Sequence, residues 1–309
     1  MRKCLALAAV SALALGASAC GGEDSGGGGG GDLSGNIRID GSSTVQPFAQ
    51  AAAELFMMEN KDVKITVGGA GTGDGFEKFC RGETQISDAS RPIEDEEIQA
   101  CKKEGIDYEE VQVANDGITV ITNKNLEVEC MTTEQLGKIF GPKSKLTNLS
   151  EAGGDLPDQE LALFSPGAES GTFDFFTEQI NGEEGVQRSQ GIQTSADDNI
   201  IVTGVSGEDG GLGYLGFSFY DENKDTLNAV AVDGGGGCVT PSSETIQSGE
   251  YKPLARPIMM YPSTKALQKP EVKAFMEFAI ENQQKISEAV GIVPMNEEQA
   301  TEAAGKLEG

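Results

Sequence analysis

Four short segments of the sequence combine glycine with serine or threonine where a helical pattern is expected to begin. They are Gly41-Ser42-Ser43-Thr44, Gly68-Gly69-Ala70-Gly71-Thr72-Gly73, Ala89-Ser90-Arg91-Pro92 and Glu169-Ser170-Gly171-Thr172. The start of a helix leaves backbone N–H groups unpaired and carries a partial positive charge, and nearby hydroxyl groups add further donors. Taken singly, each segment is an ordinary helix cap. Four of them in one chain favour convergence on a single bound anion.

The composition removes several kinds of chemistry. The 309 residues include no histidine, so an imidazole base, a histidine metal ligand and a Ser-His-Asp triad are all excluded. Lys and Arg number 23 against 50 for Asp and Glu, and the net charge of −27 argues against a protein that neutralises nucleic-acid phosphates. We therefore expect neither catalytic residues nor a nucleic-acid partner.

Nucleotide and metal motifs are also missing. The run Gly69 to Gly75 resembles a dinucleotide fingerprint, but Asp74 stands where its third glycine belongs, and no phosphate-binding loop of the nucleotide hydrolases is present. The acidic clusters 94–97 and 221–225 are typical of solvated surfaces rather than calcium loops. We therefore expect no cofactor and no metal.

The beginning of the chain is typical of an exported protein. Met1-Arg2-Lys3 precede an apolar run over 4–15 and small residues up to Cys20. This pattern predicts a signal peptide over 1–19, and the residues before Cys20 resemble a bacterial lipoprotein box in which that cysteine takes the lipid. A plain secreted chain is the alternative. Residues 20–35 are rich in glycine and predict a flexible tether that holds the body at the outer face of the cytoplasmic membrane.

The remaining cysteines are expected to form disulfides. Once Cys4 leaves with the signal peptide and Cys20 carries lipid, four cysteines are left, and an even number in an exported chain favours two bridges with three possible pairings. Cys80 and Cys101 flank one compact segment, so we favour Cys80–Cys101, with Cys130–Cys238 closing a long loop. Four buried free thiols are the alternative.

Apolar runs and helical patterns alternate along the body, which predicts an α/β fold. The expected strands lie near 36–39, 63–67, 111–113, 118–121, 161–164, 212–215, 229–232 and 258–261. The expected helices lie near 45–58, 75–80, 95–103, 133–140, 170–180, 200–205 and 270–288. The folded part should begin near Asn36.

Several motifs, in their order and spacing, resemble the phosphate-binding lipoproteins of Pst-type phosphate ABC transporters. They are Asp40-Gly41-Ser42-Ser43-Thr44-Val45-Gln46-Pro47, Asp88-Ala89-Ser90-Arg91-Pro92-Ile93, Asp116-Gly117-Ile118-Thr119-Val120, Ser170-Gly171-Thr172-Phe173-Asp174-Phe175-Phe176 and Gly210-Gly211-Leu212-Gly213-Tyr214. The resemblance extends from about Ile37 to Met295. It implies a periplasmic-binding-protein type II fold, in which two α/β lobes joined by a hinge hold an anion between them.

The resemblance also implies domain bounds and a ligand set. The first lobe would comprise 36–114 plus 257–309, and the second 115–256. The implied phosphate ligands are Ser42, Ser43, Thr44, Thr72, Ser90 and Arg91 from the first lobe and Ser170, Gly171 and Thr172 from the second. Because ligands come from both lobes, binding and closure would be one event.

The chain departs from a common form of this family at two positions. Pro166 stands where the family has an arginine, and Ser90 stands where we align a ligand aspartate. Arg91 is expected to supply one charge. Arg188 is the lone basic residue between Lys145 and Lys224, so it either supplies the missing charge of the second lobe or pairs at the surface with a glutamate. The acid that accepts the proton of phosphate is left open among Asp88, Asp116 and Asp198, each of which is also a natural cap or turn residue.

The predicted function is capture of inorganic phosphate and its delivery to the membrane permease subunits of an ABC importer. The chain would act as a monomer held to the lipid bilayer through Cys20. Its negative charge does not exclude an anion, because salt screens distant charges over about 8 Å while donors act in contact. The alternatives are a protein that binds another oxyanion or a phosphate ester, a phosphate-sensing surface protein without transport, and a phosphate-ester hydrolase.

Overall fold

The computed structural model describes residues 33–308 of the chain. The predicted signal peptide 1–19, the predicted lipid site Cys20 and the tether up to residue 32 lie outside the described residues. Strand β1 (Ser34–Gly41) begins two residues before Asn36, so the last positions assigned to the tether belong to the sheet. Within 33–308, no helix is both long enough and apolar enough to cross a bilayer.

One end of the molecule is built on a sheet in the order β2-β1-β3-β11, where β2 is Asp62–Val67, β3 is Ile86–Ala89 and β11 is Ala255–Pro262. The first three strands are parallel and β11 is antiparallel to β3. Because parallel strands end at one edge, the turns that follow β1 and β3 lie together there. The predicted anion segments Ser42 to Thr44 and Ser90 to Arg91 begin at that edge.

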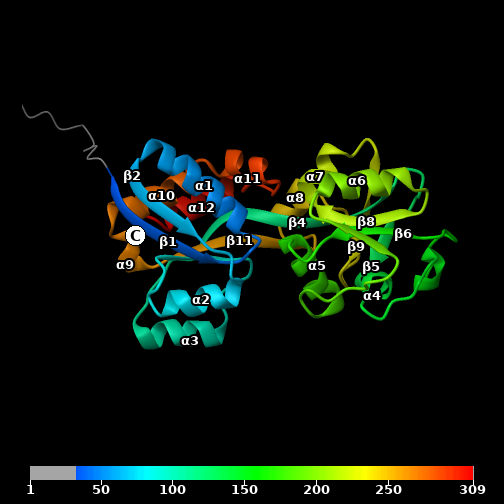
Figure 1. Ribbon diagram of the computed structural model, residues 1–309, viewed down its shortest axis with the longest axis horizontal. Helices are drawn as coiled ribbons and strands as arrows, with labels where there is room; N and C mark the ends of the chain where they lie inside the picture. Colours follow the sequence, from blue (N-terminus) through cyan, green and yellow to red (C-terminus); the bar gives the residue numbers. More distant parts are fainter. Residues whose placement is uncertain (1–32, 309) are drawn as a thin grey trace, which may run out of the picture. The chain divides into compact units, whose positions relative to one another are not determined.

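Helices cover both faces of this sheet (Figure 1). On one face lie α1 (Gln46–Glu59), α10 (Pro270–Glu281), α11 (Gln283–Val290) and α12 (Glu297–Gly305). On the other lie α2 (Thr72–Cys80) and α3 (Asp95–Glu104). Each face has its own cluster of buried apolar residues, so helices pack on both sides of the sheet, although β1 and β2 alternate buried apolar with exposed polar residues. The short helix α9 (Thr264–Leu267) follows β11.

The other end is built on strands that continue from β4 (Val111–Asn123) in the order β4-β8-β6-β7. These are β8 (Gly211–Gly216), β6 (Ala162–Pro166) and β7 (Ile192–Ser195), and the small strands β9 (Leu227–Asp233), β5 (Cys130–Thr132) and β10 (Cys238–Val239) pair beside them. One face is packed by α4 (Thr133–Phe140), the turn η1 (Leu149–Ala152) and α5 (Gly171–Asn181). The opposite face is packed by α6 (Asp198–Gly207) and α7 (Phe217–Glu222), and α8 (Ser243–Gln247) packs beside β4 and β11.

The fold is therefore two-lobed. We call the part around β1, β2 and β3 the first lobe and the part around β6, β8 and β9 the second lobe. The apolar core of the first lobe is formed by residues up to Ala114 and by residues from Ile258 onward. The apolar core of the second lobe is formed almost entirely by residues between these two positions. Strands β4 and β11 contribute to both lobes and run antiparallel through the junction (Figure 1).

Polar residues occupy the crossing of β4 and β11, and each has a partner. Asp116 lies opposite Arg256 in the ladder, and Asn115 lies opposite Pro257. The Asn115 amide donates to the carbonyl of Pro294 and to Gln299. Because these groups are satisfied, the strand continues through them where the sequence suggested a break between 113 and 118.

The disulfide prediction is confirmed. Cys80 is bonded to Cys101 and Cys130 to Cys238, with separations of 21 and 108 residues. The first bridge joins α2 to α3 under the sheet of the first lobe. The second joins β5 to β10 in the second lobe.

One expected helix was wrong, and several elements were not expected. The helix expected over 270–288 is two helices, α10 and α11, which break at Asn282. The segment Ala89 to Pro92 lies between β3, which Ala89 ends, and α3, which begins at Asp95 as expected. The strands β3, β5, β7 and β10 and the helices α7, α8, α9 and α12 were not expected.

Candidate functional site

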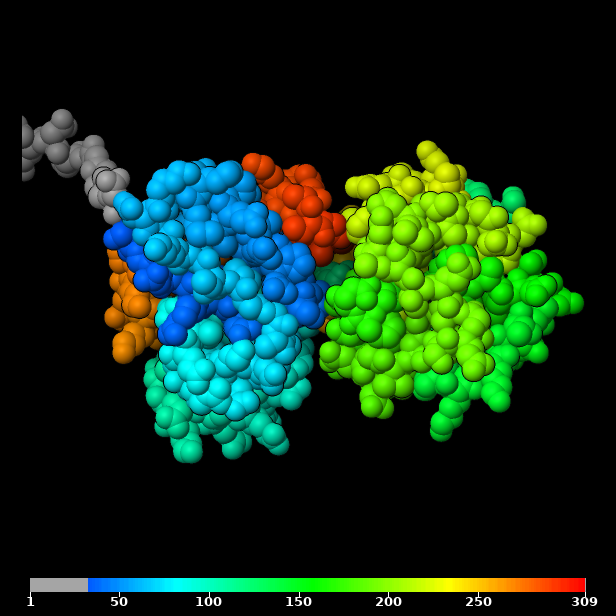
Figure 2. All heavy atoms as spheres, in the orientation of Figure 1, coloured from blue at the N-terminus to red at the C-terminus, as the bar shows by residue number. Residues whose placement is uncertain are grey.

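A pocket of about 700 Å³ lies at the junction of the lobes, where the strand ends of the first lobe face α5. Figure 2 shows the groove between the blue and cyan residues and the green ones. The pocket is lined by Ser42, Ser43, Thr44, Ala70, Gly71, Thr72, Gly73, Asp74, Ser90, Arg91 and Pro92 of the first lobe. The other lining residues are Asp174, Phe175, Glu178, Gln179, Glu184, Lys252, Pro253, Ala255, Arg256 and Pro257. All six ligands expected from the first lobe are therefore brought together.

The turn Ser42 to Thr44 is fixed to the end of β3. The amide of Ser42 donates to the carbonyl of Asp88 at 2.9 Å, and the Ser42 hydroxyl accepts from the amide of Thr44. Gly41 has a φ of 151°, and a Cβ at this position would lie 2.0 Å from the carbonyl oxygen of Asp88. Glycine is therefore required for the chain to leave β1 and turn into the pocket.

Thr72 and Ser90 approach each other from two different segments. Thr72 is the first residue of α2, and its hydroxyl lies 3.2 Å from that of Ser90, the residue after β3. The amide of Ser90 also donates to the Thr72 hydroxyl. The two side chains thus form one hydroxyl pair on the pocket wall.

Arg91 lines the pocket, but its guanidinium group is already engaged. Its two terminal nitrogens donate to both carboxylate oxygens of Glu97 at 2.9 and 2.8 Å, and Glu94 lies 3.4 Å from its Nε. The bidentate bond to Glu97 raises the pKa of Arg91. Much of the positive charge that the sequence assigned to the ligand is therefore neutralised within the first lobe.

The second-lobe segment Ser170-Gly171-Thr172, which was expected to bind the anion directly, lies beside the pocket rather than in its lining. The Ser170 hydroxyl accepts from the amide of Thr172 at 3.2 Å, so it caps α5. Gly171 reaches the first lobe, because a Cβ there would lie 2.4 Å from the hydroxyl oxygen of Thr44. Ser170, Gly171 and Thr172 adjoin the pocket through α5 but are not among the residues that line it.

A buried network positions the loop that leads to this segment. The Tyr214 hydroxyl donates to Gln187 at 2.7 Å, and the Gln187 amide donates to Ser165 at the end of β6. The Tyr214 ring also stacks on Phe176 of α5, with 3.7 Å between centroids and 9° between planes. Tyr214 therefore holds both the strand before the loop and the helix after it.

Sequence reasoning missed two cations that line the pocket, the exposed Lys252 and the buried Arg256. The Nη2 of Arg256 donates to the Thr44 hydroxyl at 2.7 Å and to the carbonyl of Gly171 at 3.2 Å, so it contacts both lobes. Its Nε donates to Asp116 at 3.1 Å, and its guanidinium carbon lies 3.8 Å from the centroid of the Phe175 ring. Within residues 33–308, no protein acceptor is in hydrogen-bonding geometry with its Nη1.

Burial affects the charge of Arg256 as well as its position. The side chain is only 10% exposed, and this burial lowers the pKa of the guanidinium while Asp116 opposes the shift. An arginine remains charged under any such shift. Asp116 therefore holds a permanent, partly desolvated positive charge at the floor of the pocket.

Arg188 is not at the pocket, which corrects the expectation that it supplies the charge of the second lobe. Its side chain is 6% exposed and donates to the carbonyls of Gln190, Ile139 and Leu146 and to the Ser144 hydroxyl. The surface alternative is wrong as well, because the residue is buried and pairs with no carboxylate in the part of the chain that the structure describes. Arg188 ties the segment after α5 to the end of α4.

The wall formed by α5 is acidic. Asp174, in the first turn of the helix, and Glu178, one turn later, both line the pocket together with Glu184. Burial, helped by the charge of Glu184, raises the pKa of Asp174 to about 6, and Arg256 opposes the shift. This wall therefore repels an anion less as the pH falls.

The three candidate proton acceptors differ sharply in their surroundings. Asp116 is occupied by Arg256, and Asp198 begins α6, away from the pocket lining. Asp88 is completely buried and does not line the pocket, and neither of its carboxylate oxygens has a hydrogen-bond partner among the described residues. Burial raises the pKa of Asp88 well above its usual value, with a further contribution from Asp40.

The comparisons with known proteins agree with one another. The model of the PBP superfamily domain matches residues 27–283. The phosphate-binding protein PstS of Staphylococcus epidermidis is 40% identical over 291 residues, which cover 92% of this chain and 87% of that protein.

Two solved structures are also similar. One, described as a possible phosphate binding protein from Planctomyces limnophilus, has 42% identity, a TM-score of 0.85 and coverage of 89% of this chain and 98% of its own. The other, a phosphate ABC transporter substrate-binding protein from Clostridium perfringens with bound phosphate, has 31% identity and a TM-score of 0.57 and covers 85% of this chain and 100% of its own. The chain therefore belongs to the PBP superfamily, and within it to the PstS phosphate-binding proteins.

Proposed function

We propose that this protein captures inorganic phosphate in the pocket between its lobes and delivers it to an ABC importer. The observation that carries the proposal is the position of Arg256, whose buried guanidinium contacts Thr44 of the first lobe and Gly171 of the second. A charged donor that touches both lobes at once links the binding of an anion to their closure. The names of the relatives point to the same ligand.

The ligand set that we propose keeps most of the sequence expectation and adds one residue. Arg256 supplies the positive charge, with Nη1 free to meet an oxygen of the ligand. Hydroxyl and amide donors come from Ser42, Ser43, Thr44, Thr72 and Ser90, which line the same pocket. On the second lobe, the backbone N–H groups of Ser170 and Thr172 are already paired with the Gly167 carbonyl and the Ser170 hydroxyl, so the start of α5 offers the N–H of Gly171. Arg91 acts at longer range, since Glu97 holds it.

Asp88 is the proposed acceptor for the proton that phosphate carries. Two features support it: the backbone carbonyl of Asp88 accepts from the amide of Ser42, which lines the pocket, and the carboxylate oxygens of Asp88 are unpaired among the described residues. Phosphate near neutral pH has a proton to donate and sulfate has none, so Asp88 distinguishes the two when it is ionised, and because burial raises its pKa this discrimination should strengthen as the pH rises. Asp116 is already paired and Asp198 is elsewhere, which leaves Asp88 as the acceptor.

The cellular setting follows from the proposal and from the start of the sequence. The chain acts outside the cytoplasmic membrane, anchored through a lipid on Cys20, and presents phosphate to membrane permease subunits as a monomer without catalysis. The lobe bounds 36–114 plus 257–309 and 115–256 are supported by the apolar cores, which divide near Ala114 and Ala255.

Calorimetry of the anion-free protein against phosphate, arsenate and sulfate tests the proposal. We expect one phosphate per chain and sulfate binding at least about a hundredfold weaker, a difference of roughly 2.7 kcal/mol. Equal affinity for phosphate and sulfate would refute the assignment. Release of product from a chromogenic phosphate ester would support a hydrolase instead, and unchanged phosphate uptake in a deletion strain would favour a sensor over a transporter.

A further inference from the structure

The two disulfides differ in exposure. Cys80 is 2% exposed and Cys101 is 0% exposed, and both lie in an apolar cluster under the sheet of the first lobe. Cys238 is exposed and Cys130 is half-buried. Because thiol–disulfide exchange requires a thiolate to reach a sulfur atom, the two bridges differ in access to a reagent in solution.

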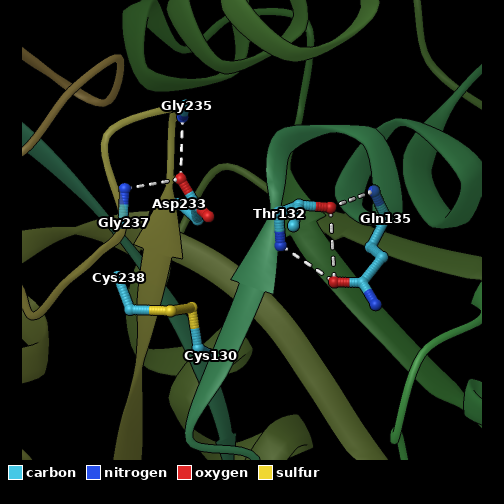
Figure 3. The surroundings of a disulfide bond; sticks show 7 residues. All are labelled: Cys130, Thr132, Gln135, Asp233, Gly235, Gly237 and Cys238. Carbon is cyan, nitrogen blue, oxygen red and sulfur yellow. Dashed lines mark hydrogen bonds between the residues drawn. A yellow bond between two sulfur atoms is a disulfide. The ribbon is translucent and has the colours of Figure 1, made fainter.

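The exposed bridge closes over one strand. Cys130 of β5 lies opposite Ala231, and Cys238 of β10 lies opposite Asp233, so the disulfide joins two of the three strands that pair with β9. Figure 3 shows the two sulfur atoms beside the loop that connects β9 to β10. That loop is Gly234 to Gly237, four glycines in a row.

The glycine loop has few restraints. The Asp233 carboxylate accepts from the amides of Gly235 at 2.8 Å and Gly237 at 3.0 Å (Figure 3). Glycine loses more backbone freedom on ordering than any other residue, so this loop is costly to hold in place. The disulfide anchors its far end at Cys238, and the two bonds to Asp233 hold its middle.

The loop also supports the pocket. Gly234 packs so closely against residue 252 that a Cβ would lie 2.4 Å from the Lys252 carbonyl oxygen. Lys252 and Pro253 line the pocket, and Arg256 follows three residues later along the chain. An ordered glycine loop therefore helps to fix the position of Lys252 and Pro253, which form the pocket wall just before β11.

We propose that Cys238 is a thiol–disulfide exchange site whose reduction loosens the glycine loop and weakens anion binding. A thiolate of a small dithiol attacks Sγ of Cys238, the bond to Cys130 breaks, and Cys130 leaves as a thiolate that takes up a proton. The second thiol of the dithiol then attacks the mixed disulfide and releases the thiol of Cys238. Two electrons pass from the dithiol, which becomes a cyclic disulfide, to the protein. The effect on binding, though not the exchange itself, rests on the proposed phosphate function.

The expected loss of affinity is small. Once the bridge is open, the loop against Lys252 becomes mobile and must be ordered again when the anion is bound. Ordering the glycine residues costs backbone entropy, part of which the Asp233 bonds still offset. We therefore expect phosphate to bind about threefold to tenfold more weakly after reduction.

The test treats the folded protein with a small dithiol, alkylates the free thiols and maps them by mass spectrometry. Alkylation at Cys130 and Cys238, with Cys80–Cys101 intact, is the expected result, and calorimetry of the same sample should show the weaker phosphate binding. Simultaneous reduction of both bridges, or selective reduction with unchanged affinity, would overturn the proposal. If the oxidised protein binds no phosphate, the proposed function fails, while the thiol map still decides the exchange site.

A variant that keeps the bridge provides the second measurement. Asp233→Ala removes both restraints on the glycine loop and should weaken phosphate binding by up to about threefold. Asp221→Ala is the matched control, because it removes one surface carboxylate of the same lobe, which pairs with Lys224. Equal affinities for the Asp233 and Asp221 variants would contradict the coupling between loop and pocket.

Discussion

The two lobes bring different chemistry to the same pocket. The first lobe offers hydroxyl groups at three separate turns, and its arginine, Arg91, is neutralised by Glu97. The second lobe uses the Ser170 hydroxyl to cap α5 and adds the carboxylates of Asp174 and Glu178. The positive charge comes instead from Arg256, on a strand that belongs to both lobes. Because β11 passes through the junction, Arg256 can contact Asp116, Thr44 of the first lobe and Gly171 of the second at the same time.

The largest effect on phosphate affinity is expected at Arg256, the charged residue that contacts both lobes. Arg256→Ala should weaken phosphate binding by a hundredfold or more, about 3 kcal/mol, because a desolvated charge-assisted contact is lost and Asp116 is left unpaired. Titration calorimetry measures the change, with circular dichroism to verify folding. Arg81→Ala is the control, since it removes one exposed arginine of the first lobe that pairs with Glu77 and Glu83. Binding of the Arg256 variant within threefold of the parent would place the charge elsewhere.

A large effect on stability, but not on binding, is expected at Arg188. Arg188→Ala removes the donor for the carbonyls of Ile139, Leu146 and Gln190, which should lower the free energy of unfolding by about 2–3 kcal/mol. Urea unfolding measures the loss, and calorimetry at a temperature where the variant is folded should give phosphate affinity within twofold of the parent. A tenfold weaker affinity at unchanged stability would restore Arg188 as a ligand.

The selectivity of the first lobe should depend on Asp88. Asp88→Asn keeps the size of the side chain but gives it an N–H that can donate to sulfate, so the preference for phosphate over sulfate should fall from about a hundredfold to about tenfold or less. Competition calorimetry with both anions measures the ratio. Asp198→Asn is the matched control, because burial also raises the pKa of Asp198 to about 6; neither aspartate lines the pocket, but only Asp88 is joined through its backbone to the lining residue Ser42. An unchanged ratio in the Asp88 variant would exclude Asp88 as the acceptor.

The smallest effect is expected from the acidic wall of the second lobe. The pKa of Asp174 is about 6, so its carboxyl is largely neutral at pH 5 and charged at pH 8, where it repels the anion. Asp174→Asn should therefore match the parent at pH 5 and bind phosphate about threefold more tightly at pH 8, roughly 0.6 kcal/mol. Comparison of the two proteins at each pH cancels the titration of phosphate itself. A constant ratio across that range would show that Asp174 does not face the ligand.

Much of the fold could be predicted because its signals are local. The helix over 133–140 and the strand near 63–67 match α4 and β2 closely, since each has an apolar face and a clear beginning. The disulfides were predictable because the export signal accounts for Cys4 and Cys20, which leaves four cysteines, and because Cys80 and Cys101 flank one compact segment. By contrast, the short strand Ile86–Ala89 has no alternation to read, as all four of its residues are buried.

The site was predictable only where it follows a strand or begins a helix. Ser42 to Thr44, Thr72 and Ser90 have that signature, and they do line one pocket. Arg256 has no local signature, because its role depends on a ladder partner, Asp116, that lies 140 residues away in the sequence. A lone arginine at the start of the strand expected near 258–261, where the hinge was expected, was the one signal that could have revealed it.

The place of β11 in the sheet also governs how the chain can fold. It pairs with β3 on one side and β4 on the other, so the first lobe cannot complete its sheet until residues 255–262 have been made. The second lobe needs almost no residue beyond that strand. The second lobe can fold from one continuous stretch of chain. The first lobe must bring together two segments separated by the whole second lobe, and closing that long loop costs conformational entropy. The first lobe should therefore be the slower to form, and the anion pocket can appear only after that late step.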